Sequence, residues 1–594
     1  MTMMQMLLMA TSSLTPLPDA YLDLDFASNS YRLADAASSY DAAFLGSSPK
    51  LTYATTSNST MVDSSGDIVW APHNLVDYSE DFSQWSASGI TLTSSTATDP
   101  LGGSTASTYS GFSSGTNSRL TEVFTAARNF KCTLAIWLKG TAGETIELEL
   151  DTDGAAENEI TFTGSWQLET ISNDYPTTGR VRIIYRTGNT ADVVSVWGAH
   201  IYRSDLGGMA PVPGAATGFE TYVPTNGAVE YLPRVGHHVY NGSTWVNEGL
   251  LLESEARTNL LTYSEDQSQG TTTDDATLSG STLTATVQSG NQFPELNRNL
   301  TVSTGTTTWW ADIENLTNVS YVTMATQLFD AGANGTSVFE LGATPNVATE
   351  NANHTATITE VEPGVYRCSV TFTTDGTDNV GKLALGMSDL SGQQRVTDPD
   401  GTESMDIVRQ QLEVGSTPSS YMPSNATAQG SRAAQTLTVP SSELGWDSSA
   451  VSLQMEGRIT ASDDAGDIMT LSQWKQTNNI RIDTKVRWNG AYQGNVQILA
   501  YNGSSPYSAF EGVGSHSVSD GVLSPYSIAW RHTSSTLQAA SSGSAISNTG
   551  TPNNGVLDLS ASDMTLGTDF MGTISHVRQW DEDIGETGIE EVTS

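Results

Sequence analysis

An eleven-residue segment occurs twice in this chain of 594 residues, at Asn74–Gln84 and again 185 positions later at Asn259–Gln269, with eight identical positions. The landmarks that follow it also return in the same order. Phe130–Gly140, a strand-like run that contains a tryptophan, has a counterpart in Thr306–Asn315. Because chance does not preserve the order of landmarks, the repeat predicts two modules with the same fold.

The ends of the two modules also match. Phe219–Thr225 and Pro418–Ser424 both contain a Tyr-x-Pro sequence near the point where the similarity stops. These ends place the first module at residues 74–225 and the second at residues 259–424.

Apolar and polar residues alternate along many short segments of the chain. In Thr145–Leu150 the residues Ile146, Leu148 and Leu150 alternate with glutamates, and Asn479–Trp488 shows the same period of two. Successive side chains of a strand point to opposite faces, so this pattern buries one face and exposes the other. Asp-Gly and Asn-Gly turn signals punctuate these runs. The sequence therefore predicts an all-β chain of tandem β-sandwich or jelly-roll domains.

The rest of the chain divides into four further regions. Residues 226–258 form a connector between the modules, and residues 425–436 are small and polar, as in a linker. Residues 437–594 have strand character without the repeat landmarks, which predicts a third domain of a different type. Residues 1–73 contain too few apolar residues for a large core of their own, so we expect an extended N-terminal arm that docks on something else.

Charge and composition exclude several classes of function. The chain has 66 acidic and 25 basic residues, a formal net charge of −41, which disfavours binding to nucleic acids or to an anionic membrane. No run of 18 apolar residues occurs, so we expect no membrane insertion, and Met1–Ala10 lacks the basic start of a signal peptide. Cys132 and Cys368 are too few and too far apart for a disulfide scaffold, and we expect both to be buried.

No catalytic or cofactor motif stands out, and we predict that the protein is not an enzyme. A nucleophile elbow with a partner histidine and a phosphate-binding glycine loop are both missing from the sequence. His237 and His238 are predicted to be structural, since adjacent strand residues face opposite ways. Asp463, Asp464 and Asp467 place oxygen ligands close together, so they are candidates for a structural calcium ion. Turn formation by aspartates is the alternative explanation.

Binding to glycans is the stronger hypothesis for function. Aromatic rings stack on sugars, and Asn or Gly loops supply hydrogen bonds. Two such places occur in the third domain, and the candidate contacts there are Trp488, Asn489, Tyr492, Tyr501 and Asn502. A core position is the alternative for Trp488. Four other tryptophans are predicted to lie in the cores of their sandwiches: Trp137, Trp197, Trp309 and Trp530.

Several of these segments resemble the modular fibre and spike proteins of tailed bacteriophages. The N-terminal part of the resemblance lies in Leu22–Phe26 and Val62–Gly66, and its most specific part is the connector Gly249–Leu261. In that family the connector introduces a carbohydrate-binding-like β-sandwich that starts with the Tyr-Ser-Glu-Asp turn found here at Tyr78–Asp81 and Tyr263–Asp266. The C-terminal domain resembles a concanavalin-A-like (laminin-G-type) jelly roll, on the evidence of Ser527–Arg531 and Phe570–Trp580.

The resemblance implies a virion surface protein that is made in the cytoplasm of a host bacterium. Residues 1–73 would attach it to other virion proteins, and the distal domains would contact host surface glycans as a lectin-like tail fibre. A homotrimer is expected, and several weak sites would act together through avidity. Two alternatives remain open: a head fibre or capsid decoration protein with a mainly structural role, and, more weakly, a polysaccharide depolymerase.

Overall fold

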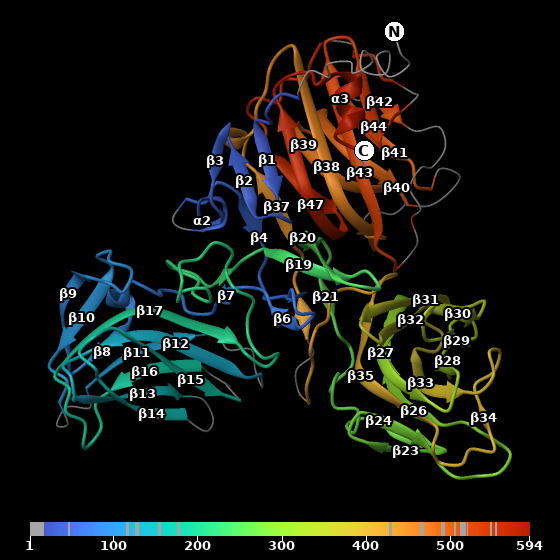
Figure 1. The fold of residues 1–594 in the computed structure, drawn as a ribbon, viewed down its shortest axis with the longest axis horizontal. Helices are drawn as coiled ribbons and strands as arrows, with labels where there is room; N and C mark the ends of the chain where they lie inside the picture. Colours follow the sequence, from blue (N-terminus) through green and yellow to red (C-terminus); the bar gives the residue numbers. More distant parts are fainter. Residues whose placement is uncertain are drawn as a thin grey trace, which may run out of the picture.

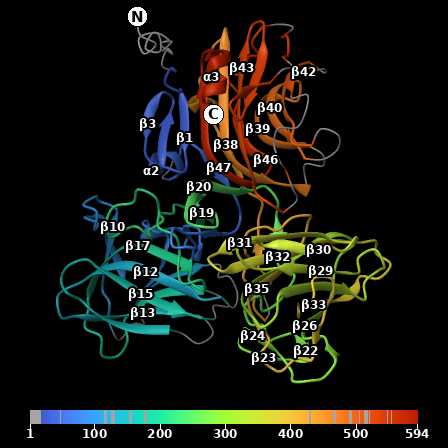
Figure 2. The ribbon, with the colours of Figure 1, turned by 45° about the vertical axis from the view of Figure 1, so that its right-hand side comes forward.

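The structure is a computed structural model in which three β-sandwich bodies meet at a central connector (Figures 1 and 2). The C-terminal jelly roll lies above the two repeated modules, which lie side by side. The structure describes residues 17–45, 48–113, 118–124, 130–151, 156–174, 179–426, 430–463, 468–488, 493–503, 506–510, 518, 521–546, 549–552 and 555–594.

The first module is a sandwich of two five-stranded antiparallel sheets. One sheet has the order β15 (Gln167–Asn173), β12 (Cys132–Lys139), β17 (Val193–Arg203), β10 (Ala106–Ser110) and β9 (Thr91–Ala97). The other has the order β14 (Ala156–Thr161), β13 (Thr145–Asp151), β16 (Gly179–Ile184), β11 (Arg119–Phe124) and β8 (Ser86–Ser88). The alternating residues Ile146, Leu148 and Leu150 all point into the core between them, as predicted.

The second module is a larger sandwich of two six-stranded sheets. One sheet has the order β22 (Thr272–Asp274), β26 (Glu295–Thr301), β33 (Val380–Ser388), β28 (Tyr321–Gln327), β29 (Gly335–Glu340) and β30 (Asn346–Thr349). The other has the order β23 (Ala276–Ser279), β24 (Thr282–Ala285), β35 (Ser404–Val414), β27 (Gly305–Thr317), β32 (Val365–Thr374) and β31 (Thr355–Glu362). Cys132 in the first module and Cys368 in the second are both free and buried, as expected.

The repeated segment has the same structural role in both modules. Ser79 Oγ lies 3.0 Å from Tyr222 Oη, and the corresponding Ser264 Oγ lies 2.7 Å from Tyr421 Oη. Each serine hydroxyl also donates to the carbonyl of the third residue after its tyrosine. The repeated segment therefore connects the start of each module to its end by hydrogen bonds.

The C-terminal jelly roll pairs a ten-stranded sheet with a seven-stranded sheet. Eight strands of the larger sheet have the order β3 (Ala36–Ser38), β2 (Ser30–Leu33), β1 (Leu22–Asp25), β47 (Met571–Trp580), β38 (Ala450–Thr460), β43 (Ser524–Thr533), β44 (Leu537–Ser541) and β45 (Ser544–Ala545). The other two strands branch from this row: β20 (Trp245–Glu253) pairs with β47, and β19 (Arg234–Tyr240) pairs with β20. The smaller has the order β4 (Thr52–Ala54), β37 (Thr436–Val439), β46 (Met564–Asp569), β39 (Ile468–Thr477), β40 (Ile480–Arg487), β41 (Val496–Asn502) and β42 (Pro506–Phe510).

The N-terminal segment docks on the C-terminal domain of the same chain. Strand β1 pairs with β47, with Leu24 opposite Val577, and β4 pairs with β37. Leu22, Leu24 and Phe26 are fully buried in the jelly-roll core. The blue strands lie beside the red strand β47 in both views (Figures 1 and 2). The apolar residues of the N-terminal segment are therefore buried within this chain, where they complete the core of the jelly roll.

Short elements complete the described part of the fold. Four two-stranded ribbons are formed by β5 (Thr60–Val62) with β6 (Ile68–Trp70), β7 (His73–Asn74) with β18 (Glu230–Tyr231), β21 (Arg257–Thr258) with β36 (Ser431–Arg432), and β25 (Asn291–Gln292) with β34 (Val396–Thr397). The short helices are α2 (Tyr40–Phe44), α3 (Gly585–Glu591) and two 3₁₀ turns at Phe82–Gln84 and Ser441–Glu443. No helix in the described ranges is long and apolar enough to cross a membrane.

Three of the four predicted core tryptophans are buried. Trp197, Trp309 and Trp530 are each 1% exposed. Trp137 is only half-buried and stacks on Phe219, with ring centroids 5.0 Å apart. Its position on the outer face of β12 follows from the alternation, since Ile136 and Leu138 occupy the core side.

Candidate functional site

An aromatic surface lies in a cleft of about 310 Å³ where the connector meets module two and the jelly roll. The hairpin of β19 and β20 carries Tyr240 and Trp245 into this cleft. The two residues are direct cross-strand partners, and their half-buried rings lie 5.3 Å apart at an angle of 54°. Figure 1 shows β19 crossing just above module two. A pair of rings in an interdomain cleft is a typical ligand platform.

The turn between the two strands holds the rings in place. Asn241 Oδ1 accepts hydrogen bonds from the backbone amides of Ser243 and Thr244, at 3.0 and 2.9 Å. Gly242 adopts a positive φ of 88°, a conformation that glycine reaches without steric cost, in the loop 241–244 between the strands. The local sequence therefore fixes the register that places Tyr240 opposite Trp245.

A second hairpin supports the indole of Trp245 from below. At Gly66, between β5 and β6, an added Cβ would lie 2.2 Å from Cζ2 of Trp245. Asp63 shapes this turn, because its Oδ1 accepts from the amides of Ser65 and Asp67. The Val62–Gly66 segment, singled out by the resemblance, thus builds the floor under one cleft ring.

Module two supplies the polar wall of the cleft. Thr359, Glu360 and Glu362 of β31 and Arg367 of β32 line it. Glu360 Oε1 accepts from the amide of Gly364 at 3.0 Å, and Glu362 forms an ion pair with an arginine of β35. Because these carboxylates are partly exposed, they can accept hydrogen bonds from ligand hydroxyls.

Arg367 is held rigidly in this wall. Its Nε and Nη2 donate to the two carboxylate oxygens of Asp312, at 2.8 and 2.9 Å, and its guanidinium lies 3.8 Å from the centroid of the Trp310 ring. Burial opposes ionisation of Asp312, but Arg367 and Arg409 outweigh it and lower the pKa of that carboxyl. The wall of the cleft is therefore preorganised.

One buried carboxylate, Glu253 at the end of β20, fixes the relative positions of the cleft walls. Its Oε2 lies 2.6 Å from Arg234 Nη2 and 3.0 Å from Arg432 Nε. The amide and hydroxyl of Ser420 donate to its two oxygens, at 2.8 and 2.7 Å. Burial opposes its ionisation, but Arg432 and Arg234 hold the pKa of Glu253 far below its usual range. Connector, module two and linker thus share one ionic centre.

The N-terminal segment joins the same centre through Arg234 and His237. Arg234 Nη1 donates to the carbonyl of Thr60 at 3.1 Å. His237 is 8% exposed, and its Nδ1 accepts from the amide of Val62 at 3.1 Å. Burial lowers the pKa of His237 to about 3, so the imidazole is neutral and structural, as the sequence predicted.

The predicted glycan contacts in the third domain are placed differently. Trp488 is 6% exposed and belongs to the jelly-roll core, because it shares the inward parity of Ile482 and Val486. This placement corrects its prediction as a stacking surface. Tyr501 and Asn502 are half-buried on β41, and the Arg481 guanidinium lies 3.5 Å from the centroid of the Tyr501 ring. Asn489 and Tyr492 lie outside the described residues.

The structure also describes one of the three calcium candidates. Asp463 Oδ2 lies 2.8 Å from Arg257 Nη2 and accepts from the amide of Ser416 at 2.9 Å. The Arg257 guanidinium therefore compensates the charge of this carboxylate. Asp464 and Asp467 lie outside the described residues, and within the described ranges no three His, Cys, Asp or Glu side chains group as a metal site.

A local sequence pattern for the cleft is present in the chain. Tyr240-Asn241-Gly242 is the same tripeptide as Tyr501-Asn502-Gly503, whose tyrosine and asparagine are predicted glycan contacts. The Glu253 centre had no such signal, because its partners lie up to about 180 residues away along the chain.

Comparisons with known proteins give structural similarities only. No protein-family model and no curated protein matches this chain. Among solved structures, it is similar to the tandem CBM22-1–CBM22-2 domains of Xyn10C from Paenibacillus barcinonensis, with 12% identity over 58% of this chain and 98% of that chain and a TM-score of 0.21.

Two further structures are similar to parts of the chain. The CBM40 domain of the Ruminococcus gnavus IT-sialidase, bound to α2,6-sialyllactose, is 14% identical over 25% of this chain and 84% of that chain, with a TM-score of 0.20. Domains LG4–5 of the mouse laminin α1 chain are 10% identical over 54% of this chain and 88% of that chain, with a TM-score of 0.16.

Proposed function

We propose that this chain is a non-enzymatic glycan-binding protein whose main binding site is the interdomain cleft. The observation that carries the proposal is the pair of half-buried rings, Tyr240 and Trp245. They line a cleft of about 310 Å³ together with polar residues of strand β31. Such rings bind the apolar face of a sugar, while Thr359 and Glu360 accept hydrogen bonds from its hydroxyls.

The physical setting supports the binding of neutral or basic sugars on a preorganised surface. The platform is held by the Asn241 turn and by Gly66, so little conformational entropy is lost when a sugar binds. The strongly acidic surface favours neutral or basic glycans over polyanions.

Glycan-array binding by the full chain tests this proposal. Trp245→Ala should remove most binding to the glycans that the wild type recognises. Trp166→Ala is the matched control, since Trp166 is also half-buried but lies on module one, where its Nε1 donates to the Thr98 carbonyl. Equal binding by wild type and Trp245→Ala would refute the cleft as the site.

The resemblance to phage fibre and spike proteins supports a role on the virion surface, as an oligomeric adhesin that contacts host glycans. Immunogold microscopy of phage particles with antibody to the whole chain tests this role. Label at the tail tip supports the host-binding fibre. Label over the head would replace it with the head-fibre or decoration role, and unlabelled particles would refute a virion location.

A further inference from the structure

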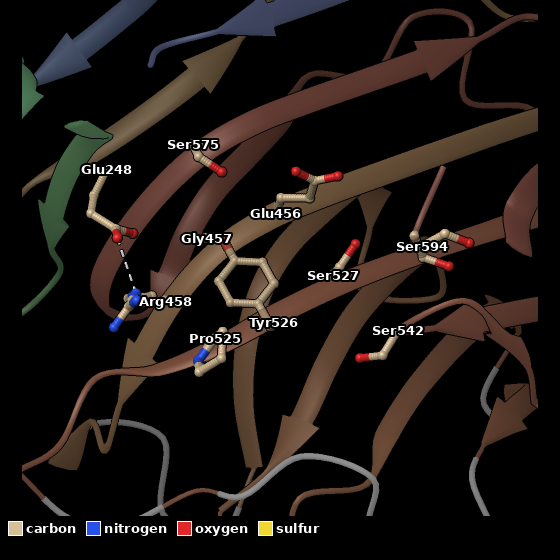
Figure 3. A pocket seen from close by; sticks show the side chains of 11 residues that line it. Glu248, Glu456, Gly457, Arg458, Pro525, Tyr526, Ser527, Ser542, Ser575 and Ser594 are labelled. Atoms are coloured by element: carbon tan, nitrogen blue, oxygen red, sulfur yellow. Dashed lines mark ion pairs between the residues drawn. The ribbon is translucent and has the colours of Figure 1, made fainter. Parts of the chain in front are cut away.

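A second hollow, of about 380 Å³, lies on the outer face of the ten-stranded sheet (Figure 3). Glu456 and Arg458 of β38, Ser527 of β43 and Ser575 of β47 line it, together with Glu248 of β20. Arg458 also lines the aromatic cleft, so the two concavities meet at this side chain.

Two glycines allow the close approach of β38 and β47 in the floor where the concavities meet. At Gly457, which lines the second hollow, a Cβ would lie 2.0 Å from the carbonyl oxygen of Thr573. At Gly572, which lines the cleft, a Cβ would lie 2.1 Å from the carbonyl oxygen of Arg458. A side chain at either position would collide with the backbone of the partner strand, so β38 and β47 pair this closely only with glycine at both positions.

The side chains around this floor suit hydroxyl groups. Glu248 Oε1 lies 3.1 Å from Arg458 Nε, an ion pair drawn as a dashed line in Figure 3, and Arg458 is 34% exposed. Glu456 Oε1 accepts from Gln454 Nε2 at 2.6 Å. The ion pair compensates the positive charge of the Arg458 guanidinium. The remaining N–H groups of Arg458 can still donate hydrogen bonds to sugar oxygens in either concavity.

We infer that the cleft and the second hollow form one continuous groove for an extended oligosaccharide of neutral or amino-sugar units, with Arg458 between neighbouring units. The inference rests on the proposed glycan-binding function and adds the length and charge of the ligand. Glu248, Glu360, Glu362 and Glu456 face the groove from both ends, which disfavours a polyanionic chain.

Calorimetry with the full chain tests the groove. The probes are gluco-, xylo- and chitosan-derived disaccharides and hexasaccharides, with hexagalacturonate as the anionic comparison. We expect a hexasaccharide to bind at least about tenfold more tightly than its disaccharide, because it contacts both concavities. Hexagalacturonate should bind more weakly than either neutral hexasaccharide.

Ser527→Trp fills the second hollow and should reduce the hexasaccharide affinity to that of the disaccharide. Ser535→Trp, on an exposed turn of the same domain, is the control and should keep the length dependence. Disaccharide binding without any gain for the hexasaccharide would overturn the continuous groove but not the cleft. If none of the probes bound at any length, both the groove and the glycan-binding function would be overturned.

Discussion

Glu253 is only 3% exposed and forms ion pairs with both Arg234 and Arg432. Glu253→Gln would leave the buried guanidinium groups of Arg234 and Arg432 without their shared counter-charge. We expect a loss of about 3–5 kcal/mol in unfolding free energy, because breaking a buried ion pair leaves uncompensated charge. Urea unfolding measures this loss.

The control is Glu157→Gln, since Glu157 pairs with Arg186 at 3.0 Å on the surface, with 45% and 41% of the side chains exposed. A surface pair contributes at most about 1 kcal/mol. Similar losses in the two variants would show that Glu253 does not hold the connector.

His532 gives a residue-scale prediction with a pH dependence. Burial lowers its pKa from 6.5 to about 4, and Tyr507 Oη lies 2.7 Å from its Nε2. Since the unfolded state binds the proton more tightly, the contribution of His532 to stability is complete above pH 6.5 and decreases as the pH falls toward 4. His532→Gln should therefore cost most at neutral pH, and its cost should shrink by up to about 1.4 kcal/mol per pH unit below 6.5.

Urea unfolding of wild type and His532→Gln across this pH range measures the effect. Because the other titrating groups are common to both proteins, they cancel in the difference. A difference that stays constant between pH 7 and pH 5 would contradict the lowered pKa.

At the scale of elements, the two hairpins of the cleft depend on each other. Gly66→Ala introduces a Cβ 2.2 Å from the Trp245 ring, at a φ of 94°. We expect the indole to move, with a change in tryptophan fluorescence and loss of the glycan binding proposed for the cleft. Gly102→Ala has a similar φ of 86° but no atom within 4 Å of its Cβ, so it separates backbone strain from the clash.

Strand β1 belongs to the jelly roll although almost the whole chain separates it from β47. Leu24→Ala removes a fully buried side chain and should cost about 2–5 kcal/mol. Thermal unfolding measures this loss, and Val123→Ala, at a position that is 64% exposed, is the control. If Leu24→Ala behaved like Val123→Ala, the N-terminal strand would not be part of the folded core.

At the scale of the whole molecule, a net charge of −41 makes the folded state repel itself. Added sodium chloride shortens the Debye length from about 30 Å at 0.01 M to about 10 Å at 0.1 M, which relieves this repulsion. We expect the Tm to rise with salt, by about 2–4 °C for each kcal/mol of relief in domains of this size. Calorimetry at increasing salt checks this, and a falling Tm would contradict it.

Local patterns in the sequence determined the all-β fold, the pair of sandwich modules and the burial of Cys132 and Cys368. Strand alternation and turn formation depend on residues that are close together in the sequence. The repeat predicts two similar modules because similar sequences adopt the same fold. The parity of Trp488 with Ile482 is a local pattern of the same kind, and it favours the core position that Trp488 occupies.

Only the tertiary structure decided where the N-terminal strands go and where a ligand surface forms. Strand β1 pairs with a partner more than 500 residues away, and the Glu253 centre joins four separate segments. The cleft itself is the space left between the connector, module two and the jelly roll, so no single stretch of sequence encodes its shape. Such features depend on long-range packing and on the exclusion of water, which local periodicity does not report.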